Sequence, residues 1–149
     1  MKKFVFTMQK MRDYKKQILE SEKNKLMTLR KEQYTMENRI SELDENMLSL
    51  GKRQTEAMLA GTNSSDLILF NMQKDGIRRE KVQLSYQLNI LLMTIERQRK
   101  AVVKISQEVS GLDKLEEQQR EEYNKLAAKE SQNAIEEFLS FKLSAQKTC

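Results

Sequence analysis

The residue types that most often perform chemistry in enzymes are scarce in this chain of 149 residues. It has no histidine and a single cysteine, Cys149. Most nucleophilic catalysis and most zinc sites need these residues, and no glycine-rich phosphate-binding loop is present. Carboxylates are adjacent at Glu116–Glu117 and at Glu121–Glu122, but a catalytic pair needs a buried cleft that separates the two pKa values. The sequence therefore predicts a protein that is not an enzyme and has no cofactor and no metal site.

The segment KKFVFTMQKMRDYKK near the start combines basic and aromatic residues. Such a segment could bind nucleic acid or an anionic membrane surface. It could equally be one flank of a coiled coil whose basic side chains pair with acidic residues on the opposite helix. The chain has 27 basic and 22 acidic residues, a net charge of +5. This mild excess permits an acidic partner without requiring nucleic acid, so we expect the coiled-coil flank.

Composition favours long helices over a thick globular core. Charged residues make up 33% and hydrophobic residues 38% of the chain, and proline is absent. A compact domain usually has about 45–50% apolar residues, whereas the residues enriched here are mostly good helix formers. No stretch is apolar for the roughly 18 residues of a membrane span. The opening MKKFVF resembles a signal peptide, but its apolar run stops at once, and we expect a cytosolic protein.

Turn residues cluster only in the stretch AGTNSSD. Gly61 suits the left-handed position that follows a helix, Asn63 can cap the next helix, and Asp66 suits that helix's first turn. The sequence thus predicts an all-α chain, with helix one at about 3–60, a turn at about 61–63 and helix two at about 64–146. We expect residues 1–149 to form a single domain, an antiparallel coiled-coil hairpin, because a short turn makes consecutive helices antiparallel.

Both predicted helices carry a heptad seam, the repeat that marks a coiled coil. The seam of helix one reads Leu19, Glu22, Leu26, Leu29, Gln33, Met36, Ile40, Leu43, Met47, Leu50, Gln54 and Ala57. The seam of helix two reads Leu67, Phe70, Lys74, Ile77, Lys81, Leu84, Leu88, Leu91, Ile95, Gln98, Val102, Ile105, Val109, Leu112, Glu116, Gln119, Tyr123 and Leu126. Near the start, the apolar residues are one position out of phase with this repeat: Phe4, Met8, Met11 and Ile18.

The two seams also predict the register of the hairpin. If Ile40 faces Leu84, the numbers of facing residues add up to about 124, and both seams then stay aligned along their whole length. Helix two must overhang, because residues 124–149 have no counterpart. The overhang contains AIEEFLSFKL, in which an apolar stripe has no partner in its own chain. Such an exposed face indicates an interaction surface.

Two stretches of the sequence resemble a known family. FVFTMQKMRDYKKQILESEKNKLMTL is similar to the N-terminal pattern of the flagellar export protein FliJ family, and LDKLEEQQREEYNKLAAKESQNAIEEF is similar to the family's C-terminal half. Met8 stands where the family usually has leucine. The positions that match the N-terminal pattern are Phe4, Phe6, Gln9, Lys10, Asp13 and Tyr14.

This resemblance implies a non-catalytic, stalk-like coiled coil of the flagellar type III protein export apparatus. Family members bind the hexameric export ATPase and promote its assembly, contact the cytoplasmic domain of the export gate, and handle substrate-specific export chaperones. The implied location is cytoplasmic, peripheral to the cell membrane at the flagellar base. The expected contacts with the ATPase ring are Phe4, Phe6, Gln9, Lys10, Ile135, Phe138, Leu139, Phe141 and Leu143.

The family's gate contact corresponds to a region near Phe70, Ile77 and Leu84. These three residues are also seam positions, so a plain role in the coiled-coil core is the competing interpretation. Two other functions stay open from the sequence. One is the equivalent stalk of a virulence type III secretion system, and the other is a basic coiled coil that binds nucleic acid or a membrane surface.

Overall fold

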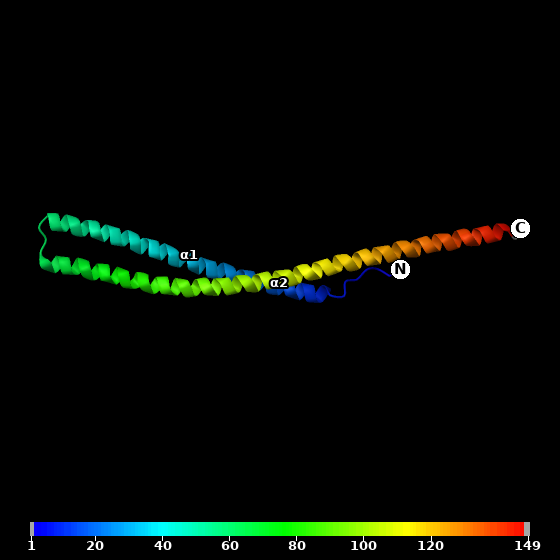
Figure 1. Cartoon of the computed structure of the whole chain (residues 1–149), viewed down its shortest axis with the longest axis horizontal. Helices are drawn as coiled ribbons and strands as arrows, with labels where there is room; N and C mark the ends of the chain where they lie inside the picture. Colours follow the sequence, from blue (N-terminus) through cyan, green and yellow to red (C-terminus); the bar gives the residue numbers. More distant parts are fainter. Residues whose placement is uncertain (1, 148–149) are drawn as a thin grey trace. The chain divides into compact units, whose positions relative to one another are not determined.

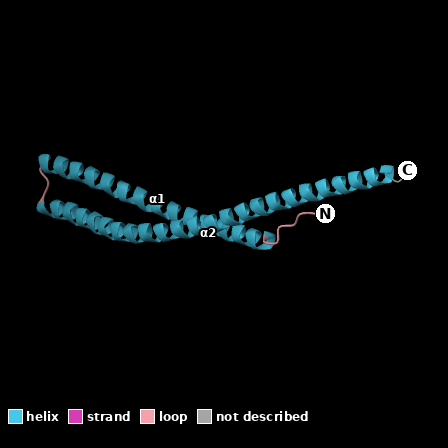
Figure 2. Cartoon of the chain, turned by 45° about the vertical axis from the view of Figure 1, so that its right-hand side comes forward, coloured by secondary structure: helices cyan, strands magenta, loops and turns pink. Residues whose placement is uncertain are grey.

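The computed structural model describes residues 2–147 and contains two long helices (Figures 1 and 2). Helix α1 spans Gln9–Leu59 with 51 residues, and α2 spans Ser64–Lys147 with 84 residues. Within residues 2–147 there is no β-strand. The two helices run antiparallel and pack along the predicted seam, so the expected all-α helical hairpin is confirmed.

Contacts divide the chain into two compact units, and each helix contributes to both. One unit, here called the turn unit, comprises Ser21–Val102. The other, the terminal unit, combines the chain up to Glu20 with the chain from Val103 onward. The turn unit contains the connection between the helices, and the terminal unit contains the N-terminal segment and the C-terminal part of α2.

The turn has the geometry expected from AGTNSSD. Gly61 has a positive φ of 83°, a conformation that favours glycine. The amide of Thr62 donates to the carbonyl of Ala57 at 3.0 Å, and the amide of Gly61 donates to that of Met58 at 3.3 Å. This pair of bonds is a Schellman motif. Asn63 Oδ1 accepts from the amide of Asp66 at 2.9 Å, so the predicted cap of the second helix is confirmed.

The heptad seam is confirmed on both helices by the pattern of burial. Every predicted seam position of α1 is buried or half-buried, and Leu43 and Leu50 are only 2% exposed. On α2 the same holds from Leu67 to Tyr123. Leu126 was predicted to extend the seam, and this was wrong, because its side chain is 57% exposed. Tyr123, which contacts Phe4 and Lys2 of the N-terminal segment, is the last predicted seam position that is half-buried.

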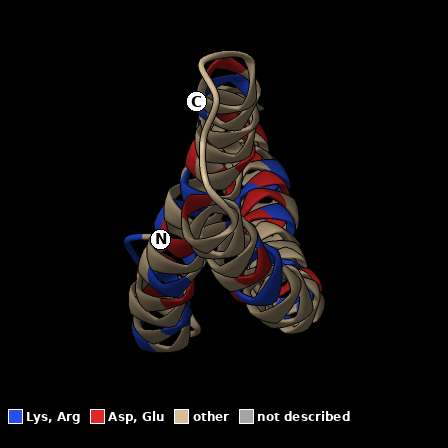
Figure 3. Cartoon of the chain, turned by 90° about the vertical axis from the view of Figure 1, so that its left-hand side faces the viewer, with Lys and Arg blue, Asp and Glu red and all other residues tan. Residues whose placement is uncertain are grey.

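Polar contacts between the helices agree with the predicted register. In the terminal unit, Lys15 Nζ lies 2.7 Å from Glu108 Oε2. In the turn unit, Lys81 forms an ion pair with Asp44. Both pairs of residue numbers add up to about 124. Gln98 donates to Glu22, one helical turn before the predicted partner Leu26. Basic and acidic side chains are interspersed along both helices (Figure 3), as expected for flanks that pair across a coiled coil.

The start of α1 differs from the prediction. Helix one was expected from about residue 3, but α1 begins at Gln9, and residues 2–6 are not helical. Positions 4–7 hold phenylalanine, valine and threonine, which are weak helix formers. The side chains of Phe4 and Phe6 instead pack against Tyr123 and Arg12. The heptad positions of the seam continue into this region, where one of them is a buried charged residue. Arg12 is 8% exposed, whereas the apolar Met11 is 48% exposed.

Candidate interaction surfaces

The C-terminal part of α2 exposes the apolar side chains that the sequence singled out. Every side chain described from Ala128 to Gln146 is exposed. We call the large apolar members of this region the overhang stripe, and their exposed fractions lie between 52% and 75%. The overhang stripe consists of Ile135, Phe138, Leu139, Phe141 and Leu143.

The overhang stripe does not simply prolong the coiled-coil seam. At about 100° per residue, Ile135, Leu139 and Leu143 lie roughly 120–200° around the helix from Tyr123, the last seam residue. Phe141 lies in line with Tyr123, and Phe138 lies between the two directions. Most of the stripe therefore faces away from the direction in which the seam points. A partner that covers it does not need to continue the packing of α1.

A second surface forms where the non-helical N-terminal segment packs on α2 within the terminal unit. The ring of Phe4 lies 5.5 Å from that of Tyr123, centroid to centroid, in a tilted arrangement. The guanidinium carbon of Arg120 lies 4.7 Å above the Phe4 ring, a cation–π contact. The hydroxyl of Tyr123 donates to the backbone carbonyl of Lys2. We call residues 2–12 the N-terminal clasp.

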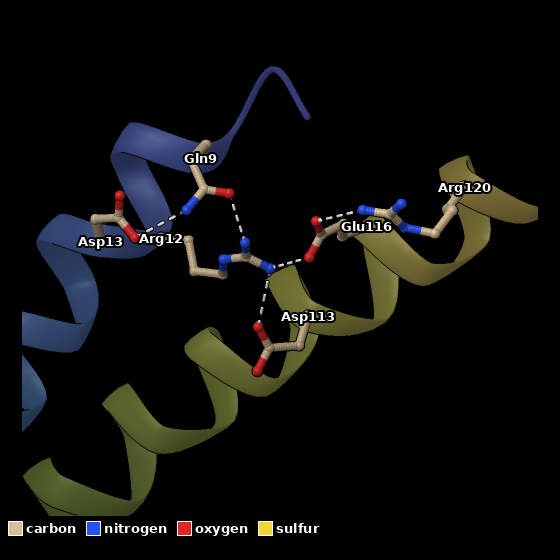
Figure 4. A network of polar contacts seen from close by, with 6 residues as sticks. All are labelled: Gln9, Arg12, Asp13, Asp113, Glu116 and Arg120. Atoms are coloured by element: carbon tan, nitrogen blue, oxygen red, sulfur yellow. Dashed lines mark hydrogen bonds and ion pairs between the residues drawn. The ribbon is translucent and has the colours of Figure 1, made fainter. Parts of the chain in front are cut away.

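Arg12 anchors the helical end of this clasp (Figure 4). Its Nη1 atom donates to Asp113 Oδ1 at 3.2 Å and also to Glu116. Its Nη2 atom donates to Gln9 Oε1 at 2.5 Å. The guanidinium lies 5.0 Å from the centre of the Phe6 ring, and Phe6 is only 5% exposed. Arg12 thus connects the N-terminal segment, α1 and α2.

Basic side chains lower the pKa of two carboxylates in the terminal unit. The hydrogen bond from Arg12 lowers the pKa of Glu116 below its usual range, and the nearby charges of Arg12 and Arg120 add to this effect. The hydrogen bond from Lys15 lowers the pKa of Glu108 in the same way. A general acid at neutral pH needs a raised pKa, so Glu116 acts here as an ion-pair partner. The pairing of Arg12 and Lys15 supports the interpretation of the basic segment as a coiled-coil flank.

The predicted N-terminal contact residues differ in how deeply they are buried. Phe6 is buried and Phe4 is half-buried, whereas Gln9 and Lys10 are exposed. Sequence reasoning missed Arg12, although a signal existed. Counting back in heptads from Glu22 and Leu19 reaches positions 15 and 12, which marks both basic residues as seam positions.

The predicted gate-contact residues lie in the turn unit. Phe70, Ile77 and Leu84 are half-buried on the α2 side of the seam, as the core interpretation expects. Other apolar side chains of the same stretch are accessible, with exposed fractions between 56% and 70%. These accessible residues are Ile68, Leu69, Met72, Val82 and Tyr86.

Two further observations concern metal binding and membrane spans among the described residues. No group of three or more histidine, cysteine, aspartate or glutamate side chains that could hold a metal ion occurs among residues 2–147. Over the same residues, neither helix has a segment long and apolar enough to cross a membrane.

The fold and its surfaces define a class of protein: an antiparallel helical hairpin whose second helix extends past the seam and exposes an apolar stripe. Comparison with known families gives the particular group. The model of the flagellar FliJ protein family matches residues 4–148, nearly the whole chain, and the chain belongs to this family. It is therefore a component of the flagellar protein export apparatus. No individual curated protein and no solved structure matches the chain.

Proposed function

We propose that this chain is the non-catalytic stalk of the export ATPase complex. The overhang stripe binds the ATPase ring and promotes its assembly and activity. The hairpin links the ring to the cytoplasmic domain of the export gate and takes part in handling substrate-specific export chaperones. It acts in the cytoplasm, at the inner face of the membrane beneath the flagellum.

One observation carries the proposal. Within the described part of α2, Ala127 is the last half-buried residue and every side chain from Ala128 to Gln146 is exposed, yet large apolar side chains continue to Leu143. Exposed apolar side chains grouped on one helix indicate a surface that another molecule covers. Membership of the FliJ family supports the ATPase ring as that molecule.

The experiment is to measure ATP hydrolysis by the export ATPase of the same organism, alone and with this chain. Full-length protein should stimulate hydrolysis. The variant Ile135→Ser/Phe138→Ser/Leu139→Ser should lose the stimulation, and so should a chain that ends at Asn133. These serine substitutions remove apolar surface from side chains that are already exposed, so circular dichroism should show an intact hairpin.

A matched control lies on the same helix. Val82, Tyr86 and Met93 are 70%, 68% and 64% exposed, so a triple serine variant removes comparable apolar surface from the turn unit. This variant should still stimulate the ATPase. If it abolished stimulation as fully as the stripe variant does, or if the stripe variant stimulated normally, the assignment of the ring contact to the overhang stripe would be wrong.

The same control variant tests the gate contact. We propose that the gate domain binds the accessible apolar side chains near Met72, Val82 and Tyr86 rather than the seam residues between them. The Val82/Tyr86/Met93 variant should therefore bind the purified gate domain more weakly while the stripe variant binds it normally. Normal gate binding by both variants would place this contact elsewhere on the hairpin.

A further inference from the structure

The N-terminal clasp is held by charge and aromatic contacts rather than by a wide apolar interface. Its contacts with α2 include the Phe4–Tyr123 ring pair, the Arg120–Phe4 cation–π contact, the ion pairs of Arg12 and the hydrogen bond from the Tyr123 hydroxyl to the Lys2 carbonyl. Phe6 is the one clasp residue with a deeply buried apolar side chain. Salt weakens contacts between charges, whereas apolar seam packing depends far less on salt.

The first turn of α1 is weak by itself. Met8 occupies the capping position, since its carbonyl accepts from the amide of Arg12 at 2.9 Å, and a methionine side chain cannot cap the free amides. The first turn contains no acidic residue. Lys10 and Arg12 instead place positive charge near the positive end of the helix dipole, which is unfavourable. The start of α1 therefore depends on its contacts with α2.

The buried ion pairs of Arg12 specify which groups must meet more than they stabilise the fold. Its guanidinium is buried, and its Nε atom has no hydrogen-bond partner within the described structure. A buried ion pair often contributes less stability than apolar packing of the same volume, but it defines which groups must meet. Here the groups are a guanidinium on the clasp and two carboxylates, Asp113 and Glu116, on α2.

We propose that the face of α2 from Asp113 to Tyr123 is a recognition site for a peptide segment that carries an aromatic residue and an arginine. In this structure the chain's own N-terminal clasp occupies the site. The clasp opens while the hairpin stays paired, and opening frees the eleven residues of α2 from Asp113 to Tyr123, about 15 Å of helix, next to the overhang. The proposal does not depend on which molecule covers the overhang stripe.

The first test measures opening in the full-length chain by double electron–electron resonance. Cys149→Ser removes the native thiol, and Lys3→Cys with Ser131→Cys carries one spin label on the clasp and one on α2. A control pair at Thr35→Cys and Asn89→Cys reports on the seam of the turn unit; all four positions are exposed.

At low salt the clasp pair should give one narrow distance distribution. It should broaden at 1 M salt and in a Phe4→Ala/Arg12→Ala chain, while the control pair stays narrow. A clasp pair that is unchanged in both conditions, or a control pair that broadens in parallel with it, would overturn a clasp that opens separately.

The second test asks whether the emptied face of α2 recognises the segment in trans. The probe is a fluorescent peptide with the sequence of residues 2–16, titrated against full-length chains at low salt. The Phe4→Ala/Arg12→Ala chain should bind it at least tenfold more tightly than the native chain, whose site is occupied. Adding Glu116→Gln to the open chain should weaken binding about tenfold, since the acceptor of the arginine's hydrogen bond loses its negative charge.

A scrambled peptide of the same composition is the control for net charge. Equal binding of the native and scrambled peptides, equal binding by the native and open chains, or no binding by the open chain would each overturn the recognition site. Because neither test contains the export ATPase, their failure would leave the proposed stalk function untouched, and failure of the ATPase experiment would leave the clasp untouched.

Discussion

Replacing Leu43 by alanine should reveal how much the seam contributes to the stability of the turn unit. Leu43 is 2% exposed and occupies a predicted seam position, whereas Leu48, five residues further along α1, is 68% exposed. Truncating a fully buried leucine costs about 2–5 kcal/mol. A two-helix seam is thin and can partly collapse around the lost atoms, so we expect about 2–3 kcal/mol for Leu43→Ala.

The matched substitution Leu48→Ala should change the free energy of unfolding by less than about 0.5 kcal/mol, because it alters an exposed position with little change in helix propensity. Urea unfolding followed by circular dichroism at 222 nm measures both. With a typical slope of about 1–3 kcal/mol per molar urea, the midpoint should fall by about 0.7–3 M for Leu43→Ala and stay nearly constant for Leu48→Ala. Similar losses for both variants would refute the assignment of Leu43 to the seam.

Four further predictions concern the turn, a glycine within α2, the clasp and the overhang. Gly61→Ala should destabilise the hairpin by about 1 kcal/mol in the same urea assay, because Gly61 has a positive φ that alanine adopts poorly. In contrast, Gly111→Ala should stabilise the helix by about 0.5–1 kcal/mol, because an added Cβ would meet no atom within 4 Å; a loss of stability there would contradict the open surroundings. Glu116 has a folded pKa below its unfolded value because of Arg12; its contribution is therefore present above about pH 4.5 and is lost as the pH falls through the folded pKa. Melting curves between pH 7 and pH 2 should show a smaller acid-induced loss for Glu116→Gln than for the native chain, and equal losses would show that this ion pair adds nothing. Finally, binding to the ATPase through the overhang stripe should vary little between 0.05 and 0.5 M salt, whereas binding through phosphate contacts would weaken steeply.

Most of the fold could be predicted because the seam repeats many times. Each heptad independently indicates the same face of the helix, and the register follows once two seams and one turn are known. The turn was predictable for a different reason, since few residues other than glycine adopt the backbone conformation found at Gly61. The prediction of Leu126 as a seam residue was wrong because periodicity describes one helix at a time. Periodicity in α2 does not show where the segment that packs opposite it ends.

The start of α1 could not be predicted from helix propensity alone. Residues 4–7 lie next to a long helical stretch, and the sequence contains no proline or glycine there to mark a boundary. The boundary is set by the tertiary contacts of Phe4 and Phe6 with Tyr123, Arg120 and Arg12. These contacts join residues more than a hundred positions apart, or link an aromatic ring to a charged group. Apolar periodicity gives no signal for either kind of contact.

In this chain, seam positions and apolar side chains do not always coincide, as Arg12 and the overhang stripe show. At Arg12 a charged side chain occupies a seam position, and the seam continues because Asp113 and Glu116 lie opposite it. Beyond Tyr123, apolar side chains continue but most of them leave the seam positions. If the overhang had evolved only to extend the coiled coil, Ile135 and Leu139 would fall in line with Tyr123, where they would meet a longer α1. Their displacement around the helix instead favours a partner that approaches α2 from another side.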